Sequence, residues 1–236
     1  MNAVLDAVTT APGFGMFLTV GAYVGAVQLH HRLGRPALLA PVFVTMVVVA
    51  LVLHLLGIPY PDYLASVSVL VILLGPATVA LALPLLRSGP ALLASCWAVL
   101  TTLLVTGVVS LGVTVAATTL LGASPEIVRT TLPRNVTSPV ALTLAETLHG
   151  VVALSVVLTL VSGVLGAVLG PGLLSLARVR DPRARGFAIG LSAHGIGTAR
   201  ALAESDTAGG WSSAAMVLNA LAMTVALPFV AGWLGG

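Results

Sequence analysis

Long apolar runs without a charged side chain make up most of the chain. They cover residues 13–29, 37–56, 63–86, 91–121, 151–174 and 211–234. A helix needs roughly 20 predominantly apolar residues to cross the hydrocarbon core of a bilayer, and a helix satisfies its backbone hydrogen bonds internally, as lipid requires. The pattern therefore predicts an all-α polytopic membrane protein. The run at 91–121 exceeds one straight span, so it must tilt or extend beyond the bilayer.

Two stretches fit this pattern poorly and decide the topology. Residues 124–149 carry several charged side chains, and residues 186–199 form an apolar run of only 14 residues. Arginines collect at residues 30–35, at Arg87 and at 178–185, which the positive-inside rule places on the cytoplasmic side. This orientation holds if residues 124–149 dip into the membrane and return, while residues 186–199 cross it. We therefore expect about seven transmembrane helices plus one re-entrant or broken segment.

With these crossings, two groups of three segments run through the membrane in opposite directions. They form inverted repeats, one within about residues 13–121 and one within about residues 124–236, of a single membrane domain. The middle segment of each group is interrupted, by Gly75 and Pro76 in the first and by residues 194–198 in the second. Discontinuous helices at corresponding positions of inverted halves indicate the binding site of a secondary transporter. The alternative is that Gly and Pro are simply frequent in transmembrane helices.

Composition excludes several functional classes. Hydrophobic residues are 58% of the chain and charged residues 7%, against about a quarter in soluble domains. The ten basic residues, all arginine, are scattered and form no basic face for a nucleic acid. Cys96 stands alone, and the sequence contains no Ser-His-Asp constellation, phosphate loop or metal-ligand cluster. We expect no enzyme activity, no catalytic residue, no metal and no cofactor, and we interpret the first apolar run as a retained span.

The most unusual polar stretch is Leu-Pro-Arg-Asn-Val-Thr-Ser-Pro at residues 132–139. Two prolines bracket Asn135, Thr137 and Ser138, and proline does not fit an unbroken hydrogen-bonded helix. Free backbone amides, side-chain hydroxyls and a helix starting at Pro139 would together hold a carboxylate. Arg134 is either an anion contact or an interfacial anchor, and the whole stretch has an alternative interpretation as an ordinary turn outside the membrane.

A second candidate stretch follows His194. Gly195 and Gly197 allow an unwound turn or a close approach of two backbones. A histidine in a charge-poor apolar run is a functional hypothesis, and its titration range suits proton coupling. The alternative is a neutral histidine bonded to a helix carbonyl. Arg200 would face a substrate carboxylate or, alternatively, pair with Glu204 one helical turn later.

Three sequence blocks closely resemble the LrgB/CidB family. They are LGASPEIVRTTLPRNVTSPVAL at 121–142, ARGFAIGLSAHGIGTARALAE at 184–204 and WSSAAMVL at 211–218. Earlier runs, RPALLAPVFV and LLGPATVALALPLL, are similar to first-half motifs of that family. The sequence departs from the family pattern at Ala193, where serine is usual, and at Gly75, where glutamine is usual.

The resemblance implies a multi-pass protein of the bacterial cytoplasmic membrane with inverted repeats and broken helices, grouped with cation/proton antiporters and bile-acid symporters. It implies one of two roles. Bacterial members are described as antiholin-like regulators of murein hydrolase activity and lysis, acting with an LrgA/CidA-like holin partner. Plastid relatives are glycolate/glycerate translocators, and bacterial ones are tied to pyruvate. Carried over by position, the substrate-binding residues are Arg134, Asn135, Thr137, Ser138, Pro139, His194, Gly195, Gly197, Thr198 and Arg200.

Our preferred hypothesis is a secondary carrier of small monocarboxylates that works by alternating access. Its partners would be the lipid bilayer, the carboxylate, a coupling ion (proton or sodium) and a second copy in a homodimer. A histidine or a carboxylate, Glu126 or Glu146, would bind that ion. The first rival is a lysis regulator that moves no solute, and the second is a passive pore.

Overall fold

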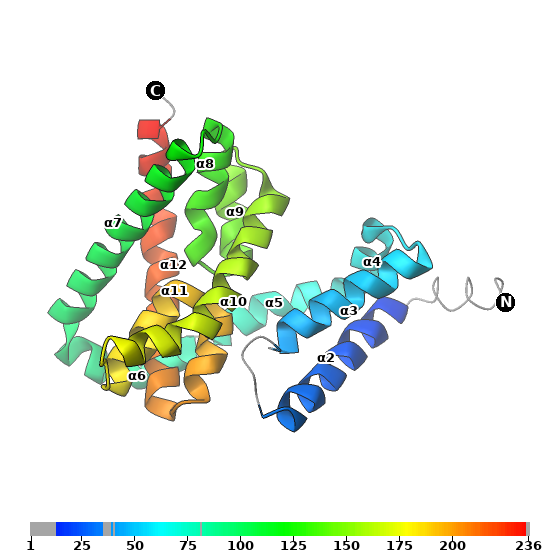
Figure 1. Cartoon of the computed structure of the whole chain (residues 1–236), viewed down its shortest axis with the longest axis horizontal. Helices are drawn as coiled ribbons and strands as arrows, with labels where there is room; N and C mark the ends of the chain where they lie inside the picture. The colour runs from blue at the N-terminus through cyan, green and yellow to red at the C-terminus, as the bar shows by residue number, and fades with distance from the viewer. Residues whose placement is uncertain (1–12, 35–38, 40, 81, 235–236) are drawn as a thin grey trace. The chain divides into compact units, whose positions relative to one another are not determined.

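The computed structural model describes residues 13–34, 39, 41–80 and 82–234, which are helices joined by turns and contain no strand. Contacts between residues divide the chain into two compact units, Met1–Ala80 and Leu81–Gly236. Each unit is described by itself, and Figure 1 labels their helices. The boundary expected between inverted halves, near residue 121, stays a prediction.

The smaller unit contains four helices. They are α2 (Phe14–Arg32), α3 (Pro41–Leu56), α4 (Tyr60–Ser66) and α5 (Ser68–Ala80). Helix α2 packs on α3 and α4, and the Thr19 and Tyr63 hydroxyls lie 2.8 Å apart. Helix α5 continues through Gly75 and Pro76, so the structure does not show the helix break expected there. A proline within a helix removes one N–H donor, which kinks a helix without always ending it.

The larger unit is built around three long helices, α7 (Cys96–Leu120), α10 (Val152–Leu176) and α12 (Asp206–Leu234). Among the described residues these three are long and apolar enough to cross a membrane. A short helix, α6 (Ala82–Ala94), ends before a turn at Ser95, which explains the excess length of the apolar run at 91–121. The chain therefore has the helices of a membrane protein, and the count of about seven spans stays a prediction.

Residues 124–151, which we name hairpin A, fold back on themselves between α7 and α10. The hairpin comprises α8 (Pro125–Thr131), the 3-10 helix η2 (Leu132–Asn135) and α9 (Ser138–Thr147). The backbone N–H of Val151 donates to the Thr130 hydroxyl at 2.9 Å, and a Cβ atom at Gly150 would lie 3.1 Å from the Thr130 backbone. The segment thus returns toward its starting level, as the orientation argument predicts.

Residues 177–205, which we name hairpin B, contain the helix α11 (Pro182–Leu202), whose backbone leaves the helical conformation at His194 with φ 39° and ψ −130°. A straight 21-residue helix would be about 30 Å long. Instead, Arg185 Nε lies 2.9 Å from Glu204 Oε2, and a Cβ atom at Gly197 would lie 3.0 Å from the Ile189 carbonyl oxygen.

Residues 186–199 therefore do not form one straight span, because α11 turns back at His194. Helix α12 consequently begins at the same level as α11 and runs beside its first half. The fit is close: a Cβ atom at Gly190 would lie 2.2 Å from the Ser212 carbonyl oxygen. Phe187 and Trp211 pack edge to face in the core between these helices, with ring centroids 6.2 Å apart.

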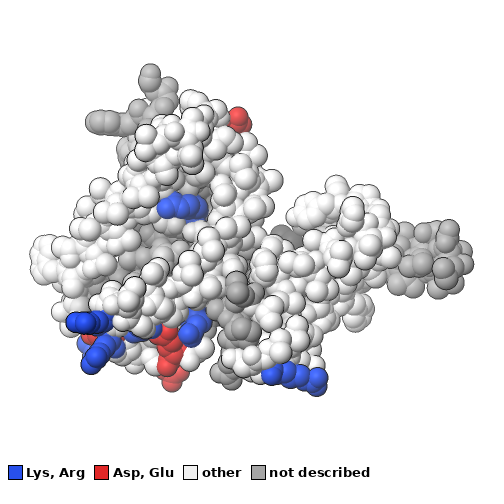
Figure 2. All heavy atoms as spheres, in the orientation of Figure 1, with Lys and Arg blue, Asp and Glu red and all other residues white. Residues whose placement is uncertain are grey.

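The two hairpins open at opposite ends of the larger unit. Hairpin A joins the start of α10 and hairpin B joins its end, and the 25 residues of α10 separate these points by about 37 Å. That length exceeds the roughly 30 Å hydrocarbon core of a bilayer. In the view of Figure 2 most charged side chains of the larger unit lie along one edge, and the rest of this face carries few charged side chains, with one basic side chain near its middle.

Candidate functional site

The tip of hairpin A reaches the middle of two long helices. The Asn135 side-chain amide donates to the Ser110 hydroxyl of α7, and the Arg134 guanidinium donates to the Thr114 hydroxyl. From α12, the Asn219 side-chain amide donates to the Asn135 carbonyl oxygen at 2.8 Å. Ser110 and Asn219 lie near the midpoints of α7 and α12. The tip is therefore held by hydrogen bonds about halfway along these two helices, a position we call mid-depth. The sequence of hairpin A alone did not predict these partners.

Helix α9 begins at this tip. Thr137 is its N-cap residue with an extended backbone, and its side chain makes no capping hydrogen bond. Thr137 and Ser138 are half-buried, whereas Pro139 is exposed. The first turn of a helix has N–H groups without intrahelical acceptors and carries roughly half a positive charge. The start of α9 therefore presents unused donors at mid-depth.

Arg134 adds a full positive charge at the same place. It is half-buried, and the ion pairs within the described residues involve Arg185 and Arg200 with Glu204, not Arg134. Hairpin A contains two carboxylates, Glu126 and Glu146, and both are exposed. The tip of hairpin A thus combines a guanidinium that lacks an acidic partner in this part of the chain with the positive end of a helix, an arrangement suited to an anion.

His194 forms the tip of hairpin B and is 3% exposed. Its Nε2 atom lies 3.0 Å from the Thr159 carbonyl oxygen of α10. A carbonyl oxygen only accepts, so Nε2 must carry the proton, and in a neutral ring Nδ1 is then an acceptor. Gly163, near the middle of α10, makes room for the ring, because a Cβ atom there would lie 2.6 Å from His194 Cε1. The histidine bonded to a helix carbonyl, weighed as an alternative from the sequence, is the arrangement observed.

The other residues of hairpin B that the sequence predicts as substrate-binding differ in their surroundings. Gly195 is exposed, and a Cβ atom there would meet Met216 Sδ at 4.0 Å, whereas Gly197 is packed against Ala193. The Thr198 hydroxyl donates to the His194 carbonyl oxygen at 2.8 Å and lies 2.9 Å from the Ser212 hydroxyl, so Thr198 links α11 to α12.

Arg200 lies away from both tips. Its Nη2 is 3.8 Å from Glu204 Oε1, and the six residues that separate it from His194 correspond to about 9 Å of helix. The pairing with Glu204 considered from the sequence is thus present, at the base of hairpin B rather than at its tip.

Two hydroxyl residues of α10 were not identified from the sequence. Ser155 and Thr159 are fully buried, and neither hydroxyl has a hydrogen-bond partner among the described residues. They lie one turn apart on the face of α10 that continues to Gly163. Threonines elsewhere, such as Thr114, donate to the carbonyl four residues earlier. The sequence feature that could have identified them is a pair of hydroxyl residues four positions apart in an apolar run.

The tip of hairpin A contacts the helices around His194. The 3-10 helix η2 packs against α10, α11 and α12, and His194 bonds to α10 through Thr159. Arg134, Asn135, the start of α9 and His194 thus belong to one region around the middle of α10, with the Ser155 and Thr159 hydroxyls on its buried face.

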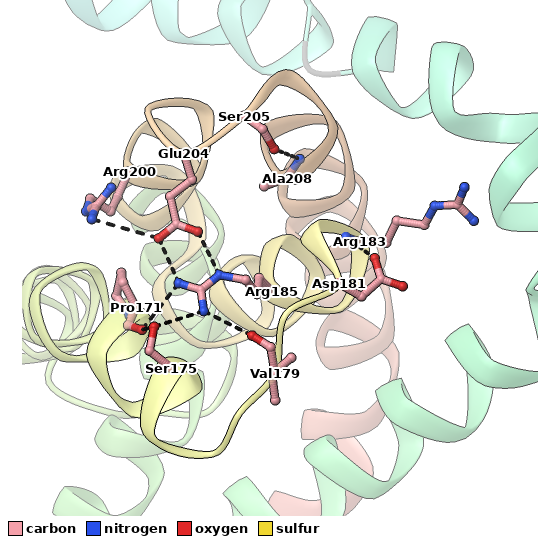
Figure 3. Close-up of polar contacts among 10 residues, drawn as sticks. All are labelled: Pro171, Ser175, Val179, Asp181, Arg183, Arg185, Arg200, Glu204, Ser205 and Ala208. Atoms are coloured by element: carbon pink, nitrogen blue, oxygen red, sulfur yellow. Dashed lines mark hydrogen bonds and ion pairs between the residues drawn. The ribbon is translucent and has the colours of Figure 1, made fainter.

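The base of hairpin B is held by one guanidinium, shown in Figure 3. Arg185 donates to both Glu204 carboxylate oxygens, at 2.9 Å from Nε and 3.1 Å from Nη2. It also donates to the Val179 carbonyl oxygen at 3.1 Å, the Ser175 hydroxyl at 3.2 Å and the Pro171 carbonyl oxygen at 3.3 Å. The hydrogen bond from Arg185 lowers the pKa of the Glu204 carboxyl, and the positive charges of Arg185 and Arg200 lower it further. All five donors are used, so this cluster is structural.

Comparison with known proteins gives the family of the chain. Residues 19–233 match the model of the LrgB-like family. Two Bacillus subtilis (strain 168) proteins are similar over most of their length: Uncharacterized protein YwbG is 33% identical over 91% of this chain and 95% of its own, and Uncharacterized protein YxaC is 34% identical over 87% and 89%. An uncharacterized protein of Haemophilus influenzae is 30% identical over 91% and 92%. No solved structure matches the chain. The chain belongs to the LrgB-like family.

Proposed function

We propose that the chain is a secondary transporter of small monocarboxylates, of the pyruvate, glycolate or glycerate type, in the bacterial cytoplasmic membrane. The substrate would bind between the tips of hairpins A and B. The observation that carries the proposal is Arg134, a half-buried guanidinium at mid-depth with no acidic partner in the described chain, close to the start of α9.

Physical chemistry favours a carboxylate as the missing partner. An ionised arginine at membrane depth is unfavourable unless it is paired or faces a water-filled cavity. A guanidinium forms two parallel hydrogen bonds with a carboxylate, and helix N-termini bind anions. The half-buried Thr137 and Ser138 hydroxyls at the start of α9 add neutral donors and acceptors suited to a 2-hydroxy or 2-oxo group.

Hairpin B supplies the opposite wall. His194 holds its Nε2 proton against Thr159, which leaves Nδ1 as an acceptor in the neutral ring. We assign ion coupling to His194 or to the buried Ser155 and Thr159 hydroxyls, because Glu126 and Glu146 are exposed. Alternating access would expose the region between the tips first to one face of the membrane and then to the other.

Flux measurements test the proposal. The purified protein is reconstituted alone in liposomes, and uptake of labelled pyruvate, glycolate and glycerate is followed under proton and sodium gradients. We expect saturable uptake that Arg134→Gln reduces at least about tenfold, the factor that 1.4 kcal/mol of lost binding represents. Arg200→Gln is the matched control, because Arg200 is also a half-buried arginine but pairs with Glu204 away from the tips.

Three outcomes contradict the carrier. Equal flux in Arg134→Gln and wild type would show that Arg134 does not bind the substrate. Flux that does not saturate and extends to unrelated solutes would indicate a pore. No flux at all, together with lysis phenotypes that require an LrgA/CidA-like holin partner, would favour the antiholin-like regulator.

A further inference from the structure

A basic pocket lies at the base of hairpin B, at the end of α10 opposite hairpin A. Its volume is about 370 Å³, and its lining residues are Ser175, Arg178, Val179, Arg180 and Arg185. Three of these five residues are arginines in a chain that has only ten. The pocket is separate from the region between the hairpin tips, so it is not the proposed substrate site.

The three arginines have different roles in this pocket. Arg185 has no donor left, because Glu204, Ser175, Val179 and Pro171 accept all of them, and it forms a fixed wall. Arg178 and Arg180 are exposed, and neither forms an ion pair with a residue that the structure describes. The pocket therefore offers two guanidinium groups to an external anion.

The backbone at Arg178 gives independent support for a ligand. Helix α10 ends in a turn in which the Val179 N–H donates to the Leu174 carbonyl oxygen at 2.9 Å, and Arg178 has φ 60°. Glycine is the usual residue at this left-handed position, because a Cβ atom there is strained. Strained residues of this kind gather at binding sites, where the side chain has a function. Favourable interaction of an arginine with the negative end of α10 is the alternative explanation.

The surface next to the pocket indicates the kind of anion. Leu169, Leu173 and Leu176 lie on the last turns of α10 and are 53%, 60% and 81% exposed. Helix α10 is long and apolar enough to span a membrane, so leucines exposed at its end would contact acyl chains near a headgroup layer. Basic pockets at the ends of transmembrane helices bind anionic lipid headgroups. We infer that Arg178 and Arg180 bind the phosphate of an anionic phospholipid, whose acyl chains lie along these leucines.

Thermal unfolding of the full-length protein in a neutral detergent tests this inference. The probes are short-chain phosphatidylglycerol, short-chain phosphatidylcholine, glycerol phosphate and inorganic phosphate. We expect phosphatidylglycerol to raise the unfolding temperature and the other three to have little effect. Each arginine near an anionic lipid contributes about fivefold in affinity, so Arg178→Gly and Arg180→Ala should each require about fivefold more lipid for the same shift.

Two features make the variants decisive. Arg178→Gly keeps the left-handed turn without strain, so its loss of response would not be due to misfolding. Arg183→Ala is the matched control, because Arg183 lies in the first turn of α11, directly after the loop, is exposed and does not line the pocket. Arg183 points away from Arg185 in Figure 3.

The possible results either support or overturn the inference. An equal shift with inorganic phosphate or glycerol phosphate would show a free phosphate ligand and overturn the lipid assignment. An equal shift with phosphatidylcholine would show that the arginines do not select the headgroup. A loss of response in Arg183→Ala as large as in Arg178→Gly would show diffuse charge attraction instead of a pocket. No shift with any probe would also overturn it. The carrier proposal depends on Arg134 and stands or falls separately.

Discussion

Hairpins A and B have similar shapes but are held in different ways. Hairpin B is fixed by close backbone contact with α12 at Gly190 and by the Arg185–Glu204 ion pair at its base. Hairpin A is held by the hydrogen bond between Thr130 and Val151, by side-chain hydrogen bonds at its tip, and by apolar side chains such as Val136 and Leu144 that share a buried cluster with Leu227 of α12. Contacts made by side chains rearrange more easily than two backbones in direct contact. We therefore infer that hairpin B is the more rigid of the two. Under the carrier proposal, hairpin A is then the part that would move during alternating access.

The largest effect is expected from Gly190→Ala. The added Cβ atom would lie 2.2 Å from the Ser212 carbonyl oxygen, so α11 and α12 must separate. Overpacking of this kind lowers the free energy of unfolding by about 3 kcal/mol. Gly172→Ala, on a part of α10 with nothing within 4 Å, is the control and should change little. Equal stability of the two variants in denaturant unfolding would show that hairpin B is not locked to α12.

A smaller effect is expected from Glu204→Gln, measured by unfolding as a function of pH. The folded state lowers the pKa of the Glu204 carboxyl, so this group stabilises the fold above its unfolded pKa. The contribution is lost as the pH falls through the lowered, folded value. At neutral pH the variant should lose about 2 kcal/mol, the value of a hydrogen bond to a charged group.

The acid-sensitive part of the unfolding curve should be reduced in Glu204→Gln and kept in Glu146→Gln, because Glu146 is exposed and has no ion pair among the described residues. An unchanged pH dependence in Glu204→Gln would mean that another acidic group links folding to pH. In that case the base of hairpin B is not the main electrostatic lock of the structure.

We expect substitutions in hairpin A to lower the free energy of unfolding less than those in hairpin B, and Thr130→Val tests this. Valine keeps the shape of the buried side chain but removes the acceptor of the Val151 N–H. The Thr130 hydroxyl also donates to the Glu126 carbonyl oxygen of its own helix at 2.7 Å, but such a bond four residues back adds little to stability. The expected loss is about 1 kcal/mol, typical of the other, neutral hydrogen bond. Thr143→Val, at an exposed position on α9, is the control. A loss as large as that of Gly190→Ala would contradict the difference between the hairpins.

The sequence predicts the long apolar helices and the return of hairpin A, because apolar length and arginine placement are local properties. It also identifies His194 and Arg134 as unusual residues. It does not predict that α11 turns back, because the deciding contact joins Arg185 and Glu204, 19 residues apart. Asn219 was missed for the same reason, since its partner Asn135 is 84 residues away. A glycine or proline marks a place where a helix can be interrupted, yet α5 continues through Gly75 and Pro76 whereas α11 turns at His194. Tertiary contacts decide whether the helix breaks and in which direction the chain continues.

The smallest effect on stability, and the sharpest test of the site, is expected from Ser155→Ala and Thr159→Val. Neither hydroxyl has a partner in the described structure, so its removal breaks no hydrogen bond. Burying an unpaired hydroxyl is unfavourable, and both variants should therefore be within about 0.5 kcal/mol of wild type or slightly more stable. Under the carrier proposal, carboxylate uptake should nevertheless fall, because that proposal assigns these hydroxyls to a bound substrate or ion rather than to the fold. Unfolding and liposome flux, measured on the same preparations, separate the two effects. If stability falls by more than 1 kcal/mol while flux is kept, the hydroxyls are structural and the face of α10 does not belong to the transport site.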